Sequence, residues 1–355
     1  MTTEIDQAKA QAFGGKMLDI INGASLALMC SVGHRTGLFE TMANLPPSTS
    51  DEIARAANLN ERYVREWLGG MTVGGIVDVD PASGRYHLPA EHAMSLTSAA
   101  GPDNLAVMTP MISQFGSVED EIVDCFRKGG GVPYSHYPSF QKGMAELSAQ
   151  VFDVALSPVI LELVPGLKER LREGIDVADV GCGAGHAINL MAQEFPNSRF
   201  VGFDFSEEGI ATARKEAQAM GLSNARFEVK DVATLDGSEK FDLIVVFDAI
   251  HDQAKPRAVL KGIHDSLKPG GVFLCSDIQA SSHVHENVGA PLAPMMYMCS
   301  TFHCMTVSLA LDGEGLGTMW GEQKARELFA EAGFPDVEVK NVQGDIMNNY
   351  YLARR

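Results

Sequence analysis

A histidine follows a long apolar run near the middle of the chain, in the stretch FDLIVVFDAIHDQ (241–253). The apolar residues predict a buried β-strand, so the strand ends just before His251. An imidazole at a strand end can cap the backbone, bind a metal ion, or act as a general base. These three hypotheses remain open on this stretch alone.

Three glycines at alternate positions follow another predicted strand, in DVGCGAG (179–185). Glycines allow a tight turn and a close approach of the backbone to a ligand. Asp204 ends the next strand, where a carboxylate can accept both hydroxyls of a ribose. Lys230-Asp231-Val232 ends the third strand, where an acidic side chain can accept an adenine amino hydrogen. The pattern predicts a nucleoside cofactor, and the GxGxG spacing favours one other than NAD, whose loops are usually GxGxxG.

Short apolar strands alternate with helical segments from about residue 166 onwards, among them VADVG, RFVGFDF, FDLIVVFDA and GVFLCSD. This alternation predicts an α/β fold with a doubly wound, Rossmann-like sheet. Two further strands, VEVKNV (337–342) and NNYYLARR (348–355), are separated by only a few residues. They are expected to pair as an antiparallel hairpin at the edge of the sheet.

These motifs, together with LKPGG (267–271), resemble the class I S-adenosylmethionine-dependent methyltransferases over roughly residues 170–280 and the closing hairpin. The resemblance implies a seven-stranded sheet with S-adenosyl-L-methionine at its edge. The whole layout resembles small-molecule O-methyltransferases that dimerise through an N-terminal winged helix. The stretches SVGHRTGLFETM and CMTVSLALDGEGLGTMWGE also resemble a mycobacterial-type methyltransferase group.

The resemblance assigns roles to residues at the ends of the predicted strands. The residues implied to hold the methionine part are Asp179, Gly181, Gly183 and Gly185. Asp204 with Phe205 would hold the ribose, Asp231 and Val232 the adenine, and Phe247 and Asp248 would flank the sulfonium. In that family a His-Asp pair after the fourth strand supplies the general base, which here is His251, and a carboxylate on the fifth strand orients it, which here is Asp277. The family often has an aromatic residue next, where this chain has Gln253, so a stacked aryl substrate does not follow.

The first hundred residues predict a mainly helical winged-helix domain, with helices up to about residue 68 and a hairpin of IVDV and RYHL joined by DPASG. This part of the chain holds seven lysines and arginines against eleven aspartates and glutamates. A reader of the DNA groove needs a basic face. A packing or dimerisation domain is therefore favoured over a DNA-binding one.

Two segments are expected to cover the substrate pocket. Residues 101–165 predict a helical linker, interrupted by RKGGGVPYSHYPSF (127–140), and residues 281–320 predict a Met-rich lid inserted into the methyltransferase domain (166–355). The predicted substrate-contacting residues are Tyr134, His136, Tyr137, Met296 and His303. A metal site built from His283, His285, His303 and Cys304 matches no zinc spacing, so none is predicted.

The overall composition restricts the partners. The 355 residues carry a formal charge of −18, which disfavours nucleic acid and anionic membranes as partners. The six cysteines form no CxxC pair, and the first residues lack the pattern of a signal peptide, so a cytoplasmic protein is expected.

The sequence thus predicts a cytoplasmic, homodimeric methyltransferase that acts on the oxygen or sulfur of a small, mostly apolar molecule. The alternative is an S-adenosylmethionine-sensing winged-helix regulator without catalysis. Methylation of nucleic acid or protein is disfavoured by the charge and by the predicted lid.

Overall fold

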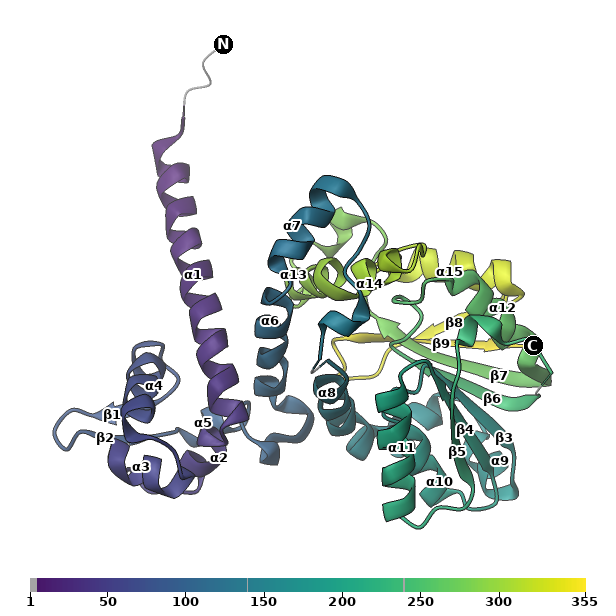
Figure 1. Ribbon diagram of the computed structural model, residues 1–355, viewed down its shortest axis with the longest axis horizontal. Coiled ribbons are helices and arrows are strands. Elements are labelled where there is room, and N and C mark those ends of the chain that lie inside the picture. Colours follow the sequence, from purple (N-terminus) through teal and green to yellow (C-terminus); the bar gives the residue numbers. More distant parts are fainter. Residues whose placement is uncertain (1–4, 139, 239) are drawn as a thin grey trace. The chain divides into compact units, whose positions relative to one another are not determined.

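The computed structural model describes residues 5–138, 140–238 and 240–355. The chain divides into two compact units, Met1–Gly116 and Ser117–Arg355 (Figure 1). The division lies inside the segment 101–165 that the sequence predicts as a linker, because α6 packs with α1 of the first unit.

The first unit is mainly helical and carries one short hairpin. Its elements are α1 (Gln7–Arg35), α2 (Leu38–Ala43), α3 (Ser50–Ala57), α4 (Glu61–Val73), β1 (Asp78–Asp80), β2 (Arg85–His87), α5 (Ala90–Ala93), η1 (Ser98–Asp103), η2 (Leu105–Met108) and α6 (Thr109–Gly116).

The winged-helix prediction is confirmed by α3, α4 and the antiparallel pair β1–β2. Helix α3 starts with a capping box between Thr49 and Glu52, which satisfies two backbone N–H groups. Trp67 of α4 packs edge-on against Phe39 in the core of the unit. Helices α1 and α2 are separated at Gly37, which has φ 70°, a left-handed conformation that ends one helix before the next begins.

The second unit contains the α/β fold. Its helices are α7 (Glu119–Lys128), η3 (Tyr134–His136), α8 (Phe140–Ala155), the π-helical turn η4 (Leu156–Ile160), η5 (Leu161–Leu163), α9 (Leu167–Glu173), α10 (His186–Glu194), α11 (Glu207–Ala219), η6 (Val232–Thr234), α12 (Pro256–Ser266), η7 (Val284–Asn287), α13 (Ala293–Cys299), the π-helical turn η8 (Ser300–Cys304), α14 (Met305–Ala310) and α15 (Gly321–Ala332). Its strands are β3 (Asp176–Val180), β4 (Arg199–Asp204), β5 (Ala225–Val229), β6 (Phe241–Phe247), β7 (Leu267–Ile278), β8 (Glu338–Lys340) and β9 (Asn348–Arg354).

These strands form the predicted seven-stranded sheet, in the order β5-β4-β3-β6-β7-β9-β8. The first five strands pair in parallel, and β9 lies antiparallel to both β7 and β8, as the hairpin prediction requires. The LKPGG stretch (267–271) belongs to β7, and the pairing of β7 with β6 shifts register across it.

Helices cover both faces of this sheet (Figure 1). On one face, α9, α10 and α11 bury residues such as Leu171, Ile188 and Ile210 in one apolar core. On the other face, α12 and α15 bury residues such as Leu260 and Phe329 in a second core. Buried on both sides, the central strand β6 is almost continuously apolar, as parallel strands in such layers usually are, whereas β3 is apolar only between and after its two aspartates, Asp176 and Asp179.

The predicted lid is largely helical. Residues 281–320 form η7, α13, η8 and α14 and then an irregular stretch that leads into α15. The backbone of Val132, between α7 and η3, donates to Thr306 Oγ1 of α14 across 2.8 Å. The insertion is thereby joined to the segment before α8.

Two helical segments have the length and apolar composition of a membrane span, α1 and residues 140–163. Core helices of water-soluble proteins pass the same test, so length and composition alone are weak evidence for a membrane span.

Candidate active site

The glycine loop connects β3 to α10 through three glycines with positive φ, at 81° for Gly181, 52° for Gly183 and 73° for Gly185. A Cβ atom at Gly181 would lie 2.6 Å from the Cβ of Ala249. At Gly183 the nearest atom would be 3.7 Å away, so the backbone there is open to a ligand. Gly181 is therefore required for packing, while Gly183 presents bare backbone at the edge of the sheet.

Asp179 stands next to the loop, near the end of β3, and is only 2% exposed. Burial, with a contribution from Asp204, raises the pKa of its carboxyl to about 8. Its Oδ1 atom has no hydrogen-bond partner among the described residues. A buried carboxylate oxygen without a partner is costly unless a cation or a donor binds to it. Asp179 therefore suits a positively charged ligand.

Asp204 joins the end of β4 to the glycine loop. Its Oδ2 accepts the N–H of Gly183 and its Oδ1 accepts the N–H of Ser206, each across 2.8 Å. Burial raises the pKa of the carboxyl, and these N–H groups partly offset the rise. The next side chain, Phe205, is half exposed, and its ring lies 5.2 Å from that of Tyr134 in an edge-to-face arrangement.

Asp231 and Val232 follow β5 at the same edge of the sheet. Asp231 caps η6 by accepting the N–H of Ala233 across 3.0 Å, and Val232 is buried in the core. The N–H of Lys230 donates to the carbonyl of Asp204 across 2.8 Å, so this strand end lies beside the previous one. The structure thus brings the two predicted nucleoside-binding segments together.

Phe247 and Asp248 end β6. Asp248 has φ 54°, a left-handed conformation that is uncommon for a residue with a side chain and often marks a functional site. Burial raises the pKa of its carboxyl to about 7, and its Oδ1 has no hydrogen-bond partner among the described residues. The ring of Phe247 packs against Phe152 of α8, with ring centres 5.0 Å apart.

His251 and Asp277 are in direct contact, as the sequence predicts. The Nδ1 atom of His251 lies 2.8 Å from Asp277 Oδ1, and both side chains are buried. Burial alone would lower the pKa of the imidazole, but Asp277, and after it Cys304, hold the pKa well above its usual value. Asp277 Oδ1 also accepts the backbone N–H of Ile278 and the indole N–H of Trp320, at 2.8 and 3.0 Å.

The predicted substrate residues Tyr134, Tyr137 and His303 form one aromatic cluster. The His303 ring stacks on Phe140 with centres 3.6 Å apart and lies edge-on to both tyrosines. Burial lowers the pKa of His303 to about 3, so this imidazole is neutral at physiological pH. Met296 is buried on α13.

His136 does not join this cluster. Its side chain is 43% exposed and lies 2.8 Å from Glu121 of α7. The sequence predicted three neighbouring substrate residues here. A 3₁₀ turn has three residues per turn, so Tyr134 and Tyr137 face the same side, whereas the side chain of His136 points elsewhere.

The histidines considered as metal ligands, His283, His285 and His303, do not lie together in one group. His283 and His285 stack on each other with ring centres 6.0 Å apart, and His303 lies in the aromatic cluster. Within residues 5–138, 140–238 and 240–355, no three His, Cys, Asp or Glu side chains are grouped as metal ligands.

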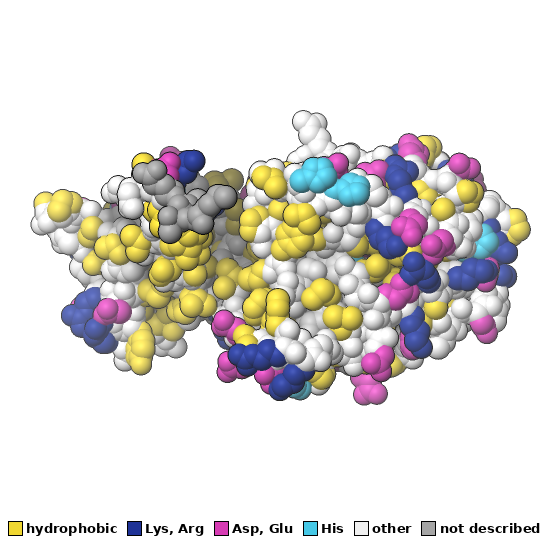
Figure 2. All heavy atoms as spheres, turned by 90° about the horizontal axis from the view of Figure 1, so that it is seen from above, with side chains coloured by type: hydrophobic (Ala, Val, Ile, Leu, Met, Phe, Trp, Pro, Cys, Tyr) yellow, Lys and Arg dark blue, Asp and Glu magenta, His cyan; other side chains and the backbone are white. Residues whose placement is uncertain are grey.

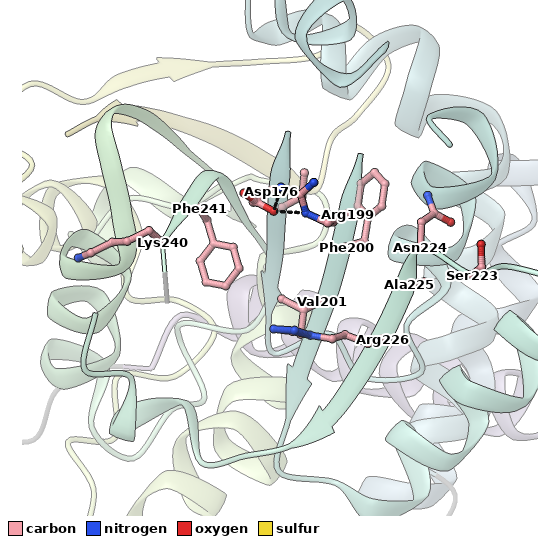
Figure 3. Close-up of a pocket in the computed structure, with 11 residues that line it drawn as sticks. Asp176, Arg199, Phe200, Val201, Ser223, Asn224, Ala225, Arg226, Lys240 and Phe241 are labelled. Carbon is pink, nitrogen blue, oxygen red and sulfur yellow. Dashed lines mark hydrogen bonds and ion pairs between the residues drawn. The ribbon is translucent and has the colours of Figure 1, made fainter. Parts of the chain in front are cut away.

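A cavity of about 420 Å³ lies at the other edge of the sheet (Figure 3). It is lined by the first residues of β3, β4 and β5, among them Asp176, Arg199 and Ala225. The charged groups there pair locally: Arg199 lies 2.7 Å from Asp176 and Arg226 lies 3.4 Å from Glu228. This cavity is remote from the glycine loop and does not belong to the candidate active site.

Two residues of the site were missed from the sequence, Trp320 and Cys304. Trp320 lies 43 residues beyond Asp277 in the chain and reaches it only because the insertion folds back over the sheet. Cys304, at the end of η8, contributes after Asp277 to the raised pKa of the His251 imidazole. The sequence places both in the lid but gives no indication of their partners.

Two sequence-family models match the chain. Residues 24–98 match an Rv2258c-like winged HTH domain, and residues 171–333 match a methyltransferase domain. The chain carries a methyltransferase domain. Its boundaries span the glycine loop, the His251–Asp277 pair and α15, so every predicted cofactor residue lies in the methyltransferase domain.

Curated relatives match about a third of the chain. The ubiquinone biosynthesis O-methyltransferase of Ruegeria pomeroyi is 33% identical over 110 residues, 31% of this chain and 44% of that protein. The trans-aconitate 2-methyltransferase of Variovorax paradoxus is 38% identical over 109 residues, 29% of this chain and 38% of that protein. The chain thus spans less than half the length of these relatives.

Solved structures match the whole chain at low identity. Human N-acetylserotonin methyltransferase, in complex with S-adenosylmethionine, superposes with a TM-score of 0.70 and 19% identity, covering 100% of this chain and 99% of that one. An O-methyltransferase family protein from Burkholderia thailandensis gives 0.67 and 15%, with coverages of 96% and 97%. The chain therefore shares the fold of these structures, and in this chain a winged-helix domain is joined to a class I methyltransferase domain.

Proposed function

We propose that the chain is an S-adenosylmethionine-dependent methyltransferase that acts on the oxygen or sulfur of a small, mostly apolar molecule. The observation that carries the proposal is the gathering of the glycine loop with Asp179, Asp204 and Asp248 at one edge of the sheet. The relatives that match this domain are named as methyltransferases, and one solved structure of this fold contains S-adenosylmethionine.

The residues at this edge fit the cofactor. Asp179 and Asp248 each offer a buried oxygen without a partner among the described residues, which suits the cationic groups of S-adenosylmethionine. Gly181, Gly183 and Gly185 would hold its methionine part, Asp204 and Phe205 its ribose, and Asp231 and Val232 its adenine, with Phe247 and Asp248 beside its sulfonium. When bound, the cofactor supplies a methyl group on a positively charged sulfur.

His251 is proposed as the general base. Asp277 receives the hydrogen on Nδ1 and thereby leaves Nε2 to accept a proton from an alcohol, phenol or thiol. The raised pKa of the imidazole makes it a stronger base and shifts its working range towards alkaline pH. Positioning and exclusion of water by the chain supply the remaining rate enhancement.

The acceptor is expected to contact the aromatic cluster and the lid. Tyr134, Tyr137, His303 and Met296 offer mostly apolar surface, because burial keeps the His303 ring neutral and raises the pKa values of both tyrosines. A small molecule with one hydroxyl or thiol and an otherwise apolar body fits these neighbours. His136 is exposed, so it is expected to contact the acceptor only at the edge of this cluster.

The direct test is methyl transfer from labelled S-adenosylmethionine to a panel of small phenols, alcohols and thiols. With an accepted substrate, His251→Ala is expected to lower the rate by roughly 10²–10⁴-fold. His285→Ala is the matched control, because its side chain is 82% exposed in the lid. Equal rates for the wild type and His251→Ala would reject the base assignment, and no transfer to any acceptor class would count against the proposal itself.

A cofactor-sensing regulator without catalysis is the second candidate, favoured by the winged HTH match. The surface of the winged-helix domain argues against a regulator. On α4, Arg62 pairs with Glu66, and Arg65 pairs with Glu61. A helix that neutralises its own arginines is a poor reader of DNA. A salt-sensitive gel shift with genomic DNA would support the regulator, and no shift would reject it.

The assembly is proposed to be a cytoplasmic homodimer formed through α1. This helix has 29 residues, yet only Cys30, Ser31 and Gly33 are buried. Its exposed apolar side chains include Phe13, Leu18 and Ile21, and hydrophobic side chains gather on this unit in Figure 2. A contiguous apolar surface of this kind favours a protein interface, and two-fold dimers are the commonest assemblies. Light scattering should give a dimer for the wild type and a monomer for Leu18→Glu, whereas a monomeric wild type would reject the proposal.

A further inference from the structure

His186, the first residue of α10, lies between two carboxylates that come from two other helices. Its Nδ1 atom is 2.7 Å from Glu216 Oε1 of α11, and its Nε2 atom is 2.9 Å from Asp153 Oδ1 of α8. A carboxylate at neutral pH only accepts hydrogen bonds, so both ring nitrogens must carry a hydrogen to bond both partners. The geometry therefore requires a positively charged imidazolium, which joins three helices.

The two carboxylates are held to different degrees. Oε2 of Glu216 accepts the side-chain N–H of Asn189 across 2.7 Å, and the Glu216 side chain is 31% exposed, against 57% for Asp153. A neutral imidazole keeps one N–H, which can serve only one of the two acids. We expect Nδ1 to keep it for Glu216, so that Nε2 turns a lone pair towards Asp153. Loss of the proton from His186 then removes the bond between α8 and α10.

Helix α8 is held by partly exposed contacts. None of its residues, Phe140–Ala155, all of which the structure describes, is fully buried. Its apolar contacts include the ring of Phe152, which packs against Phe247 of β6 with ring centres 5.0 Å apart. A helix with little buried surface opens locally at a low free-energy cost, so one ion pair changes the population of its open state.

The other end of α8 lies at the glycine loop. The atom nearest to a Cβ placed on Gly183 would be Gln141 Oε1, at 3.7 Å. The same side chain donates from Nε2 to the hydroxyl of Tyr134 across 2.6 Å, and the Tyr134 ring lies edge-on to Phe205. The helix that His186 fastens thus lies over the loop that is proposed to hold the methionine part of the cofactor.

The charged groups that face the imidazole come from the two helices packed against α10. They are Asp153 of α8 and Glu216 of α11, while α10 itself contributes the neutral amide of Asn189. The strand β5 presents the apolar ring of Phe227 to the same turn. Burial would lower the pKa of the imidazole, but the hydrogen bonds to the two acids hold the pKa above its usual value. The imidazolium therefore persists at neutral pH and is lost at more alkaline pH.

We propose that His186 is a positioning residue for the cofactor site, whose imidazolium fastens α8 to α10 and α11 and releases α8 when it loses its proton. The proton-dependent fastening belongs to the folded chain itself, and only its effect on the cofactor rests on the proposed function. Because the pKa is raised in the folded chain, the fastening is complete below the ordinary histidine pKa and is lost as pH rises through the raised pKa. Helix α8 should then open more often over the glycine loop.

The first experiment measures hydrogen exchange of α8 peptides in the full chain without ligands, from about pH 6 to about pH 9, on both sides of the ordinary histidine pKa of about 6.5. After correction for the intrinsic exchange rate, the wild type should lose protection by roughly 2–5-fold as pH rises, the effect of losing one partly exposed ion pair. This step should be absent in His186→Gln and in Asp153→Ala. A wild type without the step, or a step that persists in His186→Gln, would overturn the proposal.

His264→Gln is the matched control. The side chain of His264 is 21% exposed, against 20% for His186, and it pairs with Asp265 at 3.1 Å on α12, which covers the opposite face of the sheet. This variant should keep the wild-type step in α8. Loss of the step in His264→Gln would mean that the step reports a general loosening of the fold, and it would overturn the role of His186.

The second experiment tests the effect on the cofactor site. Release of S-adenosylhomocysteine at neutral pH, followed by stopped flow, should be roughly 2–5-fold faster from Asp153→Ala than from the wild type or His264→Gln. Equal release rates would overturn the link to the cofactor site, while the exchange step would stand. A folded wild type that binds no S-adenosylhomocysteine would reject the proposed cofactor site and the link with it, a failure that the exchange experiment, carried out without ligand, does not share.

Discussion

Trp320 donates its indole N–H to Asp277 Oδ1 across 3.0 Å, and the same oxygen lies 2.8 Å from Nδ1 of His251. The backbone N–H of Ile278 is a third donor to this oxygen. Donors of this kind stabilise a buried carboxylate and fix its orientation. Trp320 thus orients Asp277, and Asp277 in turn orients the imidazole of His251.

Replacing Trp320 with Phe keeps an aromatic ring but removes the donor to Asp277. Because a hydrogen bond to a charged group contributes about 1.5–3 kcal/mol, the free energy of unfolding should fall by about that amount. Trp67→Phe is the matched control, since the Trp67 indole donates to the neutral carbonyl of Met29 at 2.8 Å, and the expected loss is about 0.5–1.5 kcal/mol. Chemical denaturation measures both, and an equal loss in the two variants would contradict the special role of the indole.

Asp277 is expected to set the pH dependence of turnover. With the pKa of His251 raised by Asp277, the imidazole loses its proton only above its ordinary pKa, so kcat/KM should rise with pH through an alkaline-shifted midpoint. Asp277→Asn removes this carboxylate, so the midpoint should move towards acid and the rate should fall by roughly 10²-fold or more. A pH profile of the variant that keeps the wild-type midpoint would show that Asp277 does not act through the imidazole.

The strand ends could be predicted from the sequence because each is marked locally. A buried apolar run followed by Gly181 or by Asp204 identifies both the strand and the edge at which it ends. Parallel pairing then brings these ends together, and the contact of His251 with Asp277 follows from the order of β6 and β7.

The lid contacts could not be predicted because they depend on how an insertion folds back. Trp320 and Cys304 meet the His251–Asp277 pair through a loop and a π-helical turn that no periodicity marks. The same limit applies to His136, because a 3₁₀ turn in an irregular segment decides which side chains face outwards.

Cofactor affinity should depend on the ionisation of two buried acids. The pKa values of Asp179 and Asp248 are raised to about 8 and about 7, so both carboxyls are increasingly protonated below those values. Cationic groups of S-adenosylmethionine favour the ionised forms, so affinity should increase as pH rises through this range, with release of protons on binding below it. Calorimetry in buffers of different ionisation enthalpy measures both quantities, and an affinity that falls or stays constant over this range would contradict the assignment of the two acids.

Gly181 should tolerate no side chain. Alanine there must adopt φ 81°, which costs about 1–2 kcal/mol, and its Cβ would lie 2.6 Å from that of Ala249, which adds about 1–3 kcal/mol of overpacking. Gly221→Ala is the control, since φ is 69° but no atom lies within 4 Å of the added Cβ, so only the backbone cost is expected. Denaturation of both variants separates the two terms, and equal stabilities would mean that the loop shifts to accept the side chain.

The most direct test of the central claim is a calorimetric titration of the full chain with S-adenosylhomocysteine, in parallel with Asp204→Ala. Asp204 accepts the N–H of Gly183 and stands where the ribose is proposed to bind, so its loss should weaken both the loop and the contact. We expect saturable binding at one site per chain in the wild type and a large loss of affinity in the variant. No binding by the folded wild type, or equal binding by the two proteins, would contradict the assignment of this sheet edge as the cofactor site.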